Sequence, residues 1–220
     1  TEVVFHHLKG DWVARQILAE LSGLTVNDTT NQHSIKIIFG DNKHPQDQLV
    51  YTDLSEMFPG YIFENGKSTY RGEEVSEGGQ VYSEPGMYVN AALLDVESMH
   101  PTSVEELNAF GPYTKRFSDI KKGRLAIKHG RTDLLEGLLD GKLVPFITGA
   151  TFSLDDLSNG LKTFINSVYG LTSAHFDNPF RHPRNIDNIV AKRGALFMID
   201  LKHAVQEKGF VVAHIKTDSI

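Results

Sequence analysis

Residues 162–170 read Lys-Thr-Phe-Ile-Asn-Ser-Val-Tyr-Gly, and they end a longer stretch, from Leu154 to Tyr169, in which apolar residues recur at α-helical spacing. Lys162, Asn166 and Tyr169 stand at positions i, i+4 and i+7, so they project from one face of the predicted helix. We therefore expect a cation, an amide and a phenol to be presented together. A solvent-facing charged helix is the competing interpretation, and the spacing alone does not decide between the two.

A second helical pattern covers about Lys115 to Leu139, and a turn separates it from the first. Arg124 and Lys128 share one face of it at positions i and i+4. If the two helices pair, Arg124, Lys128 and Lys162 can converge on a triphosphate, because guanidinium and ammonium groups both bind phosphate oxygens. The basic residues of this stretch are Lys115, Arg116, Lys121, Lys122, Arg124, Lys128 and Arg131.

Further elements are predicted from periodicity and from stop signals. Helices are expected over residues 3–24 and 188–208, each with a glycine at its end. Residues 35–39 are predicted to form a short strand, and residues 87–96 and 210–215 to form buried strands, because these runs are apolar and rich in β-branched or aromatic residues.

Two aspartates, Asp95 and Asp218, fall at or just after the ends of predicted strands. Carboxylates at strand ends that line one cleft would suit magnesium, which takes a few hard oxygen ligands and leaves positions for substrate phosphates. A turn-forming or helix-capping role is the alternative for each aspartate.

Composition excludes several classes of function. The chain has 220 residues, 40% of them apolar, with a net charge of −6 and no cysteine. It therefore has no disulfide, no thiolate zinc site and no cysteine nucleophile. No apolar run is long enough to span a bilayer, and the first residues show no secretory signal pattern.

Three segments resemble the signatures of family B, phage-like DNA polymerases, and they occur in the order found in that family. Residues 95–103, Asp-Val-Glu-Ser-Met-His-Pro-Thr-Ser, are similar to the first signature. Residues 162–170 are similar to the second, which is the most specific, and residues 217–219 to the end of the third. An unrelated α/β protein with chance matches is disfavoured because the three occur as an ordered set.

The resemblance implies an α+β fold, a palm sheet with helices and an inserted antiparallel fingers hairpin. It assigns residues 1–24 to the last helix of an exonuclease domain, 25–112 and 171–220 to the palm, and 113–170 to the fingers. The exonuclease and thumb domains are then expected outside this chain, which alone would have little processive activity. The implied location is the cytoplasm of a bacterial or phage-infected cell, with no membrane partner.

By the same resemblance the chain is a DNA-directed DNA polymerase, which joins dNTPs to a primer–template using two Mg²⁺ ions, or Mn²⁺ in their place. Asp95 and Asp218 are the implied catalytic residues and metal ligands, with the Val96 carbonyl as a further ligand. The implied nucleotide-binding residues are Ser98, Met99, His100, Arg124, Lys128, Lys162, Asn166 and Tyr169, and the implied DNA-binding residues are Gly78, Gly79 and Lys216.

Two positions depart from the family pattern. His100 replaces the tyrosine that excludes ribonucleotides, and Lys216 replaces the first aspartate of the third signature. These departures keep a second hypothesis open, a catalytically weak or inactive polymerase-like module that binds nucleic acid or nucleotides. In that case Asp95 and Asp218 would bind no ion jointly.

Overall fold

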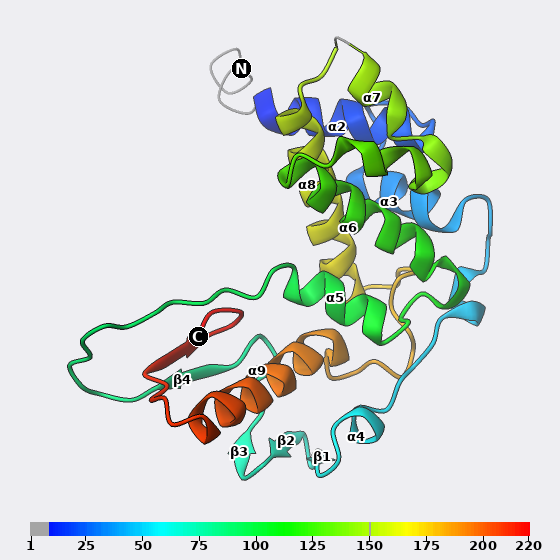
Figure 1. Cartoon of the computed structure of the whole chain (residues 1–220). Helices are drawn as coiled ribbons and strands as arrows, with labels where there is room; N and C mark the ends of the chain where they lie inside the picture. The colour runs from blue at the N-terminus through cyan, green and yellow to red at the C-terminus, as the bar shows by residue number, and fades with distance from the viewer. Residues whose placement is uncertain (1–8, 150) are drawn as a thin grey trace. The chain divides into compact units, whose positions relative to one another are not determined.

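The computed structural model describes residues 9–149 and 151–220, and the chain folds as an α+β protein with many helices and short antiparallel strands (Figure 1). It divides into two compact units. The helical unit comprises residues 1–49 and 110–181, and the mixed unit comprises residues 50–109 and 182–220. Each unit therefore joins segments that are distant in the sequence. The assignment of these segments to a palm and fingers stays a prediction.

The helical unit is built around one long helix, α8, against which α2, α3 and α6 pack. Its fully buried side chains include Ile17, Phe117 and Phe164, so its interior is apolar. The main helices are α2 (Lys9–Ser22), α3 (Thr30–Phe39), α6 (Thr114–Lys128) and α8 (Leu154–Ser173). The shorter ones are α7 (Val144–Thr148) and the 3₁₀ turns η1 (Pro45–Gln48), η2 (Gly111–Tyr113), η3 (Thr132–Gly137) and η4 (Leu139–Gly141).

The mixed unit combines two small sheets with helices. One sheet has the order β1-β2-β3, and in the other β4 pairs with β5. Helices α5 and α9 pack together, and a core of Met99, Met198, Val212 and Ile215 lies beside them. The elements are α4 (Leu54–Met57), β1 (Ile62–Glu64), β2 (Lys67–Tyr70), β3 (Glu73–Glu74), β4 (Val81–Ser83), α5 (Met99–Glu106), α9 (Ile189–Glu207) and β5 (His214–Lys216).

The strand predicted over residues 35–39 is wrong, because these residues form the last part of α3. The helix begins at a capping box: the Thr29 hydroxyl accepts from the Gln32 backbone, and the Gln32 side chain accepts from the Thr29 backbone. The reciprocal pair satisfies two backbone donors that a helix start leaves free, so the helix extends through the apolar run to Phe39.

The buried strand predicted over residues 87–96 is also wrong. Figure 1 shows the segment between β4 and α5 as a long loop, and Met87 and Val89 are 99% and 86% exposed. Asn90 has φ of 58°, a left-handed conformation that interrupts an extended run. Only residues 94–96 pair with another segment.

Two further predicted elements are shorter than expected. The helix predicted over residues 115–139 stops at Lys128, because Gly130 with φ of 69° turns the chain and 3₁₀ turns follow. The strand predicted over residues 210–215 begins only at His214, since its partner β4 is three residues long. Phe210 is accordingly exposed.

The helices predicted over residues 154–169 and 188–208 are confirmed as α8 and α9, and most of the first helix as α2. Residues 3–8 of that first helix lie outside the described residues. Within residues 9–149 and 151–220, none of the helices is both long and apolar enough to cross a membrane.

Candidate functional site

The segments that carry Asp95 and Asp218 meet in the mixed unit. The Val96 amide donates to the Asp218 carbonyl at 2.8 Å, and Leu94 and Ile220 exchange two backbone hydrogen bonds of 2.8 and 2.9 Å. Asp95 then lies directly opposite Ser219 in an antiparallel bridge. Two aspartates far apart in the sequence are therefore held on adjoining backbone segments.

Asp218 lies in a tight turn at the end of β5. The Lys216 and Ser219 backbones exchange hydrogen bonds of 3.0 and 3.1 Å, so Thr217 and Asp218 form a two-residue hairpin loop. Thr217 has φ of 59°, which is unusual for a β-branched residue. The strained turn sets the backbone position of Asp218.

The ladder presents Asp95 on the face away from the core. Directly opposed residues in an antiparallel ladder share a face, so Asp95, Ser219 and Lys216 lie on one side. Val96, Ile215 and Ile220 pack in the core on the other side. The exposed Asp95 carboxylate accepts a hydrogen bond of 2.9 Å from the Ser219 hydroxyl.

Residues 98–100 begin helix α5. Ser98 is its N-cap residue with φ of 57°, and Met99 is buried in the core, 3% exposed. Any contact between Met99 and a nucleotide would therefore have to be made by its backbone. His100 is half-buried. Burial lowers the pKa of the His100 imidazole, and the negative charge of Asp218 acts to raise it, so Asp218 lies within electrostatic range of this helix start.

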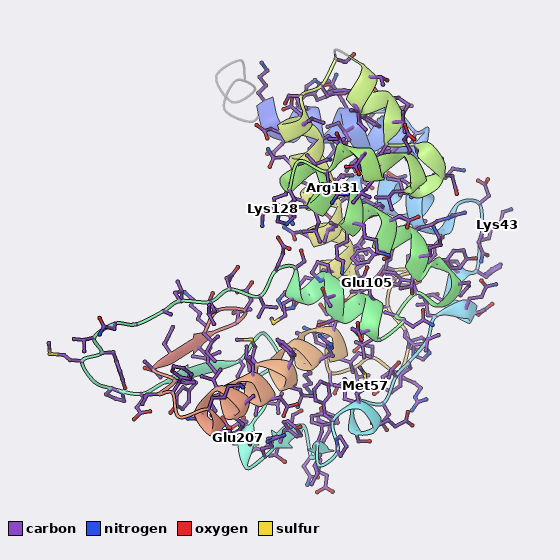
Figure 2. All side chains as sticks on the ribbon, viewed as in Figure 1. Lys43, Met57, Glu105, Lys128, Arg131 and Glu207 are labelled. Carbon is purple, nitrogen blue, oxygen red and sulfur yellow. The ribbon has the colours of Figure 1, made fainter. Side chains whose placement is uncertain are left out.

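The predicted phosphate-binding residues belong to the helical unit. Lys162 and Asn166 are exposed and Tyr169 is half-buried, on the side of α8 away from its buried face. Arg124 is half-buried on α6. Lys128 is the exposed last residue of the same helix (Figure 2). Because α6 packs against α8, the predicted phosphate-binding residues of the two helices lie in one unit.

The predicted DNA-binding glycines adjoin the Asp218 turn. Gly79 has φ of 140°, and a Cβ built on it would lie 2.9 Å from Cγ2 and Oγ1 of Thr217. Nothing lies within 4 Å of a Cβ built on Gly78. Lys216 is exposed in β5, opposite Val81 on one side and Ser219 on the other.

Neither Gln80 nor Thr217 was predicted from the sequence as a site residue, although Thr217 belongs to the third signature-like segment. The Thr217 amide donates to the Gln80 carbonyl at 2.8 Å, which ties the turn to the residue just before β4. The available signal was the adjacent glycine pair of residues 78 and 79, since a paired glycine often marks a close backbone approach.

The donor set of the two aspartates fits a hard cation, because carboxylate and carbonyl oxygens suit magnesium. In the described part of the chain, no three or more His, Asp or Glu side chains gather in a way that could hold a metal. A site here would thus depend on two carboxylates, a backbone carbonyl and oxygens from the substrate.

Comparisons of the chain with protein-family models, with curated proteins and with solved structures found no match.

Proposed function

We propose that this chain is the palm-and-fingers part of a DNA polymerase that transfers dNTPs to a primer 3′-hydroxyl. The observation that carries the proposal is the backbone pairing of residues 94–96 with residues 218–220, which holds Asp95 and Asp218 on adjoining segments. The three ordered signature-like segments add to it. In the proposal, residues 25–112 and 171–220, which include the mixed unit, are the palm, and residues 113–170 of the helical unit are the fingers.

The mixed unit would supply the oxygen ligands. Asp95, Asp218 and the Val96 carbonyl would hold Mg²⁺, which when bound favours deprotonation of the attacking hydroxyl and neutralises charge on the leaving pyrophosphate. The Asp95 carboxylate is exposed and the Asp218 residue is half-buried at the turn. Asp218 is opposed to Val96, so its residue position lies on the face of the ladder opposite to Asp95. Joint binding of one ion therefore requires the two carboxylates to approach one another around the hairpin tip.

The basic residues of the helical unit would bind the substrate phosphates. Half-buried Arg124 would give directional guanidinium donors to phosphate oxygens. Exposed Lys162 would add a point charge. Asn166 and Tyr169 are the further residues of the helical unit that we propose to bind the nucleotide, and Ser98 and His100 are those of the mixed unit.

One observation favours a second candidate, a polymerase-like module that binds nucleic acid or nucleotides without catalysis. Lys216 shares the outer face of the ladder with Asp95 and Ser219, where the family pattern has a carboxylate. An ammonium group on this face lowers the local negative charge and so weakens attraction for a cation.

Single-nucleotide incorporation with the chain in excess over primer–template distinguishes the two candidates. Asp95→Asn and Asp218→Asn should each lower incorporation by about 100-fold or more, since both remove electrostatic stabilisation of the transition state. Binding of primer–template, measured by mobility shift, should stay within about threefold. Asp177→Asn, a change at an exposed position of the helical unit, is the matched control.

A second measurement does not depend on catalysis and serves if nucleotide incorporation by the wild type is too slow to detect. Mn²⁺ should broaden the backbone amide signals of residues 95 and 218 in NMR spectra of the wild type and of neither asparagine variant. Incorporation that survives both substitutions would refute the assigned roles. DNA binding with neither incorporation nor broadening would establish the non-catalytic module instead.

A further inference from the structure

The loop of residues 76–80 lies against the hairpin turn that carries Asp218. Its end contacts the turn twice, through the Gln80 carbonyl, which accepts from the Thr217 amide at 2.8 Å, and through Gly79, whose missing side chain makes room for the Thr217 side chain. The next residues, β4, pair with β5, so the loop and the turn are also joined through the sheet. The loop thus fixes the residue before Asp218.

The backbone of Asp218 is held on its other side as well. Its carbonyl accepts from the Val96 amide, and Ser219 bonds to Lys216 within the hairpin. The turn is therefore tied to two other segments, at residues 79–80 and at residue 96, although it contains a β-branched residue at φ of 59°. A strained conformation persists only where its surroundings determine it, and such strain is common at functional sites.

The loop has its own anchor at the start of α9. The Asn188 side-chain amide donates to the Glu77 carbonyl at 3.1 Å, and the buried Lys192 ammonium lies 3.7 Å from the Glu77 carboxylate. Asn188 is also the N-cap residue of α9. A continuous series of contacts therefore leads from α9 through the loop to Thr217.

We infer that Gly79, Gln80 and Thr217 are positioning residues, which hold the Asp218 turn in the conformation that a metal-binding carboxylate requires. The inference rests on the proposed function and assigns to Gly79 a role in the turn in addition to DNA contact. The alternative is that the contact only stabilises the fold. The two differ for Thr217→Gly, because glycine adopts positive φ without strain but loses the side-chain contact.

The experiment compares four variants of the chain by urea unfolding and by Mn²⁺ titration of the amide signals of residues 95 and 218. Thr217→Gly should unfold at the same or a higher urea concentration and yet bind Mn²⁺ about tenfold more weakly, as expected for a group that orients a ligand. Gly79→Ala should weaken binding similarly, because the added Cβ meets Thr217 at 2.9 Å. Gly79→Ala combined with Thr217→Gly should match the Mn²⁺ affinity of Thr217→Gly alone, since the clash is then absent, but should be less stable because alanine at φ of 140° is strained.

Gly72→Ala is the matched control. Gly72 also has a positive φ, 79°, but nothing lies within 4 Å of a Cβ built on it. It should lose stability through its own backbone strain and keep wild-type Mn²⁺ affinity. The positioning role would be overturned if Thr217→Gly bound Mn²⁺ with wild-type affinity. It would also be overturned if Gly72→Ala and Gly79→Ala lost equal amounts of Mn²⁺ affinity.

The proposed function and this inference can fail separately. If the wild type itself shows no Mn²⁺ broadening at residues 95 and 218, the polymerase proposal fails. The inference that the loop fixes the turn is then decided by hydrogen exchange of the Thr217 amide, which donates to the Gln80 carbonyl. Faster exchange in Gly79→Ala than in Gly72→Ala supports it, and equal exchange overturns it.

Discussion

Lys192 in α9 is a fully buried cation, and removing its charge should strongly destabilise the mixed unit. Its Nζ lies 3.0 Å from Oδ2 of Asp187, and the two side chains are 0% and 7% exposed. The ammonium also lies 4.2 Å from the centre of the Phe63 ring. We predict that Lys192→Met, which keeps an unbranched side chain, lowers the free energy of unfolding by about 3–5 kcal/mol.

This magnitude follows from the carboxylate that the substitution would strand. Breaking a buried pair by removing one partner costs about 3–5 kcal/mol, because the desolvation of the remaining charge is no longer compensated. Asp187 is vulnerable, since its Oδ1 is already buried with no hydrogen-bond partner in the described part of the chain. The lost cation–π contact would add about 0.5–2 kcal/mol, and burial of the methionine would offset part of the total.

Urea unfolding followed by circular dichroism, with hydrogen exchange at the α9 amides, measures the effect. The double variant Asp187→Asn/Lys192→Met should recover more than half of the loss, because no charge is then left buried. Glu77→Gln is the control: this carboxylate lies 3.7 Å from Lys192 but is 65% exposed, so its loss should cost less than about 1 kcal/mol. A cost below about 1 kcal/mol for Lys192→Met, with no recovery in the double variant, would refute the reasoning.

Two further predictions concern the helical unit. Gly123→Ala should lower the free energy of unfolding of this unit in urea by about 1–3 kcal/mol, because the new Cβ would lie 2.6 Å from Leu143 Cδ1. Gly170→Ala should raise the same free energy by about 0.5–1 kcal/mol, because nothing lies within 4 Å of a Cβ built there. The opposite order of the two effects would contradict the packing argument. Burial and the charge of Arg15 lower the pKa of His33 below its ordinary value of 6.5, so the denatured state takes up a proton first. Stability should then be complete above about pH 6.5 and fall as the pH drops toward the folded-state pKa, with a smaller slope in His33→Gln; equal slopes would exclude this role for His33.

The helices that could be predicted from the sequence are those with a long apolar face and a clear stop. Helix α8 repeats its buried residues over twenty positions and begins at a capping box of Ser153 and Asp156. The short apolar run ending at Phe39 had no such length, so its period could not separate helix from strand. The deciding signal was the pair Thr29 and Gln32, spaced as a capping box.

The predicted strand at residues 87–96 failed because strand formation depends on a partner as well as on composition. Its pairing stops at Leu94, opposite Ile220, and the apolar residues before it stay in water. The meeting of the Asp95 and Asp218 segments is likewise a long-range pairing that no local pattern contains. Only the order of the signature-like segments and the position of both aspartates near predicted strand ends indicated this pairing. The glycine pair of residues 78 and 79 indicated a close approach, but it did not identify Thr217 as the contact.

The alternation of the chain between the two units has a consequence for its synthesis. The helical unit has all its segments once residue 181 has left the ribosome, whereas residues 50–109 must wait for residues 182–220 before their core can close. Domains of larger proteins fold as units during translation, and exposed apolar surface on an unfinished one promotes aggregation. Residues 50–109 are therefore the part of the nascent chain that we expect chaperones to bind for longest.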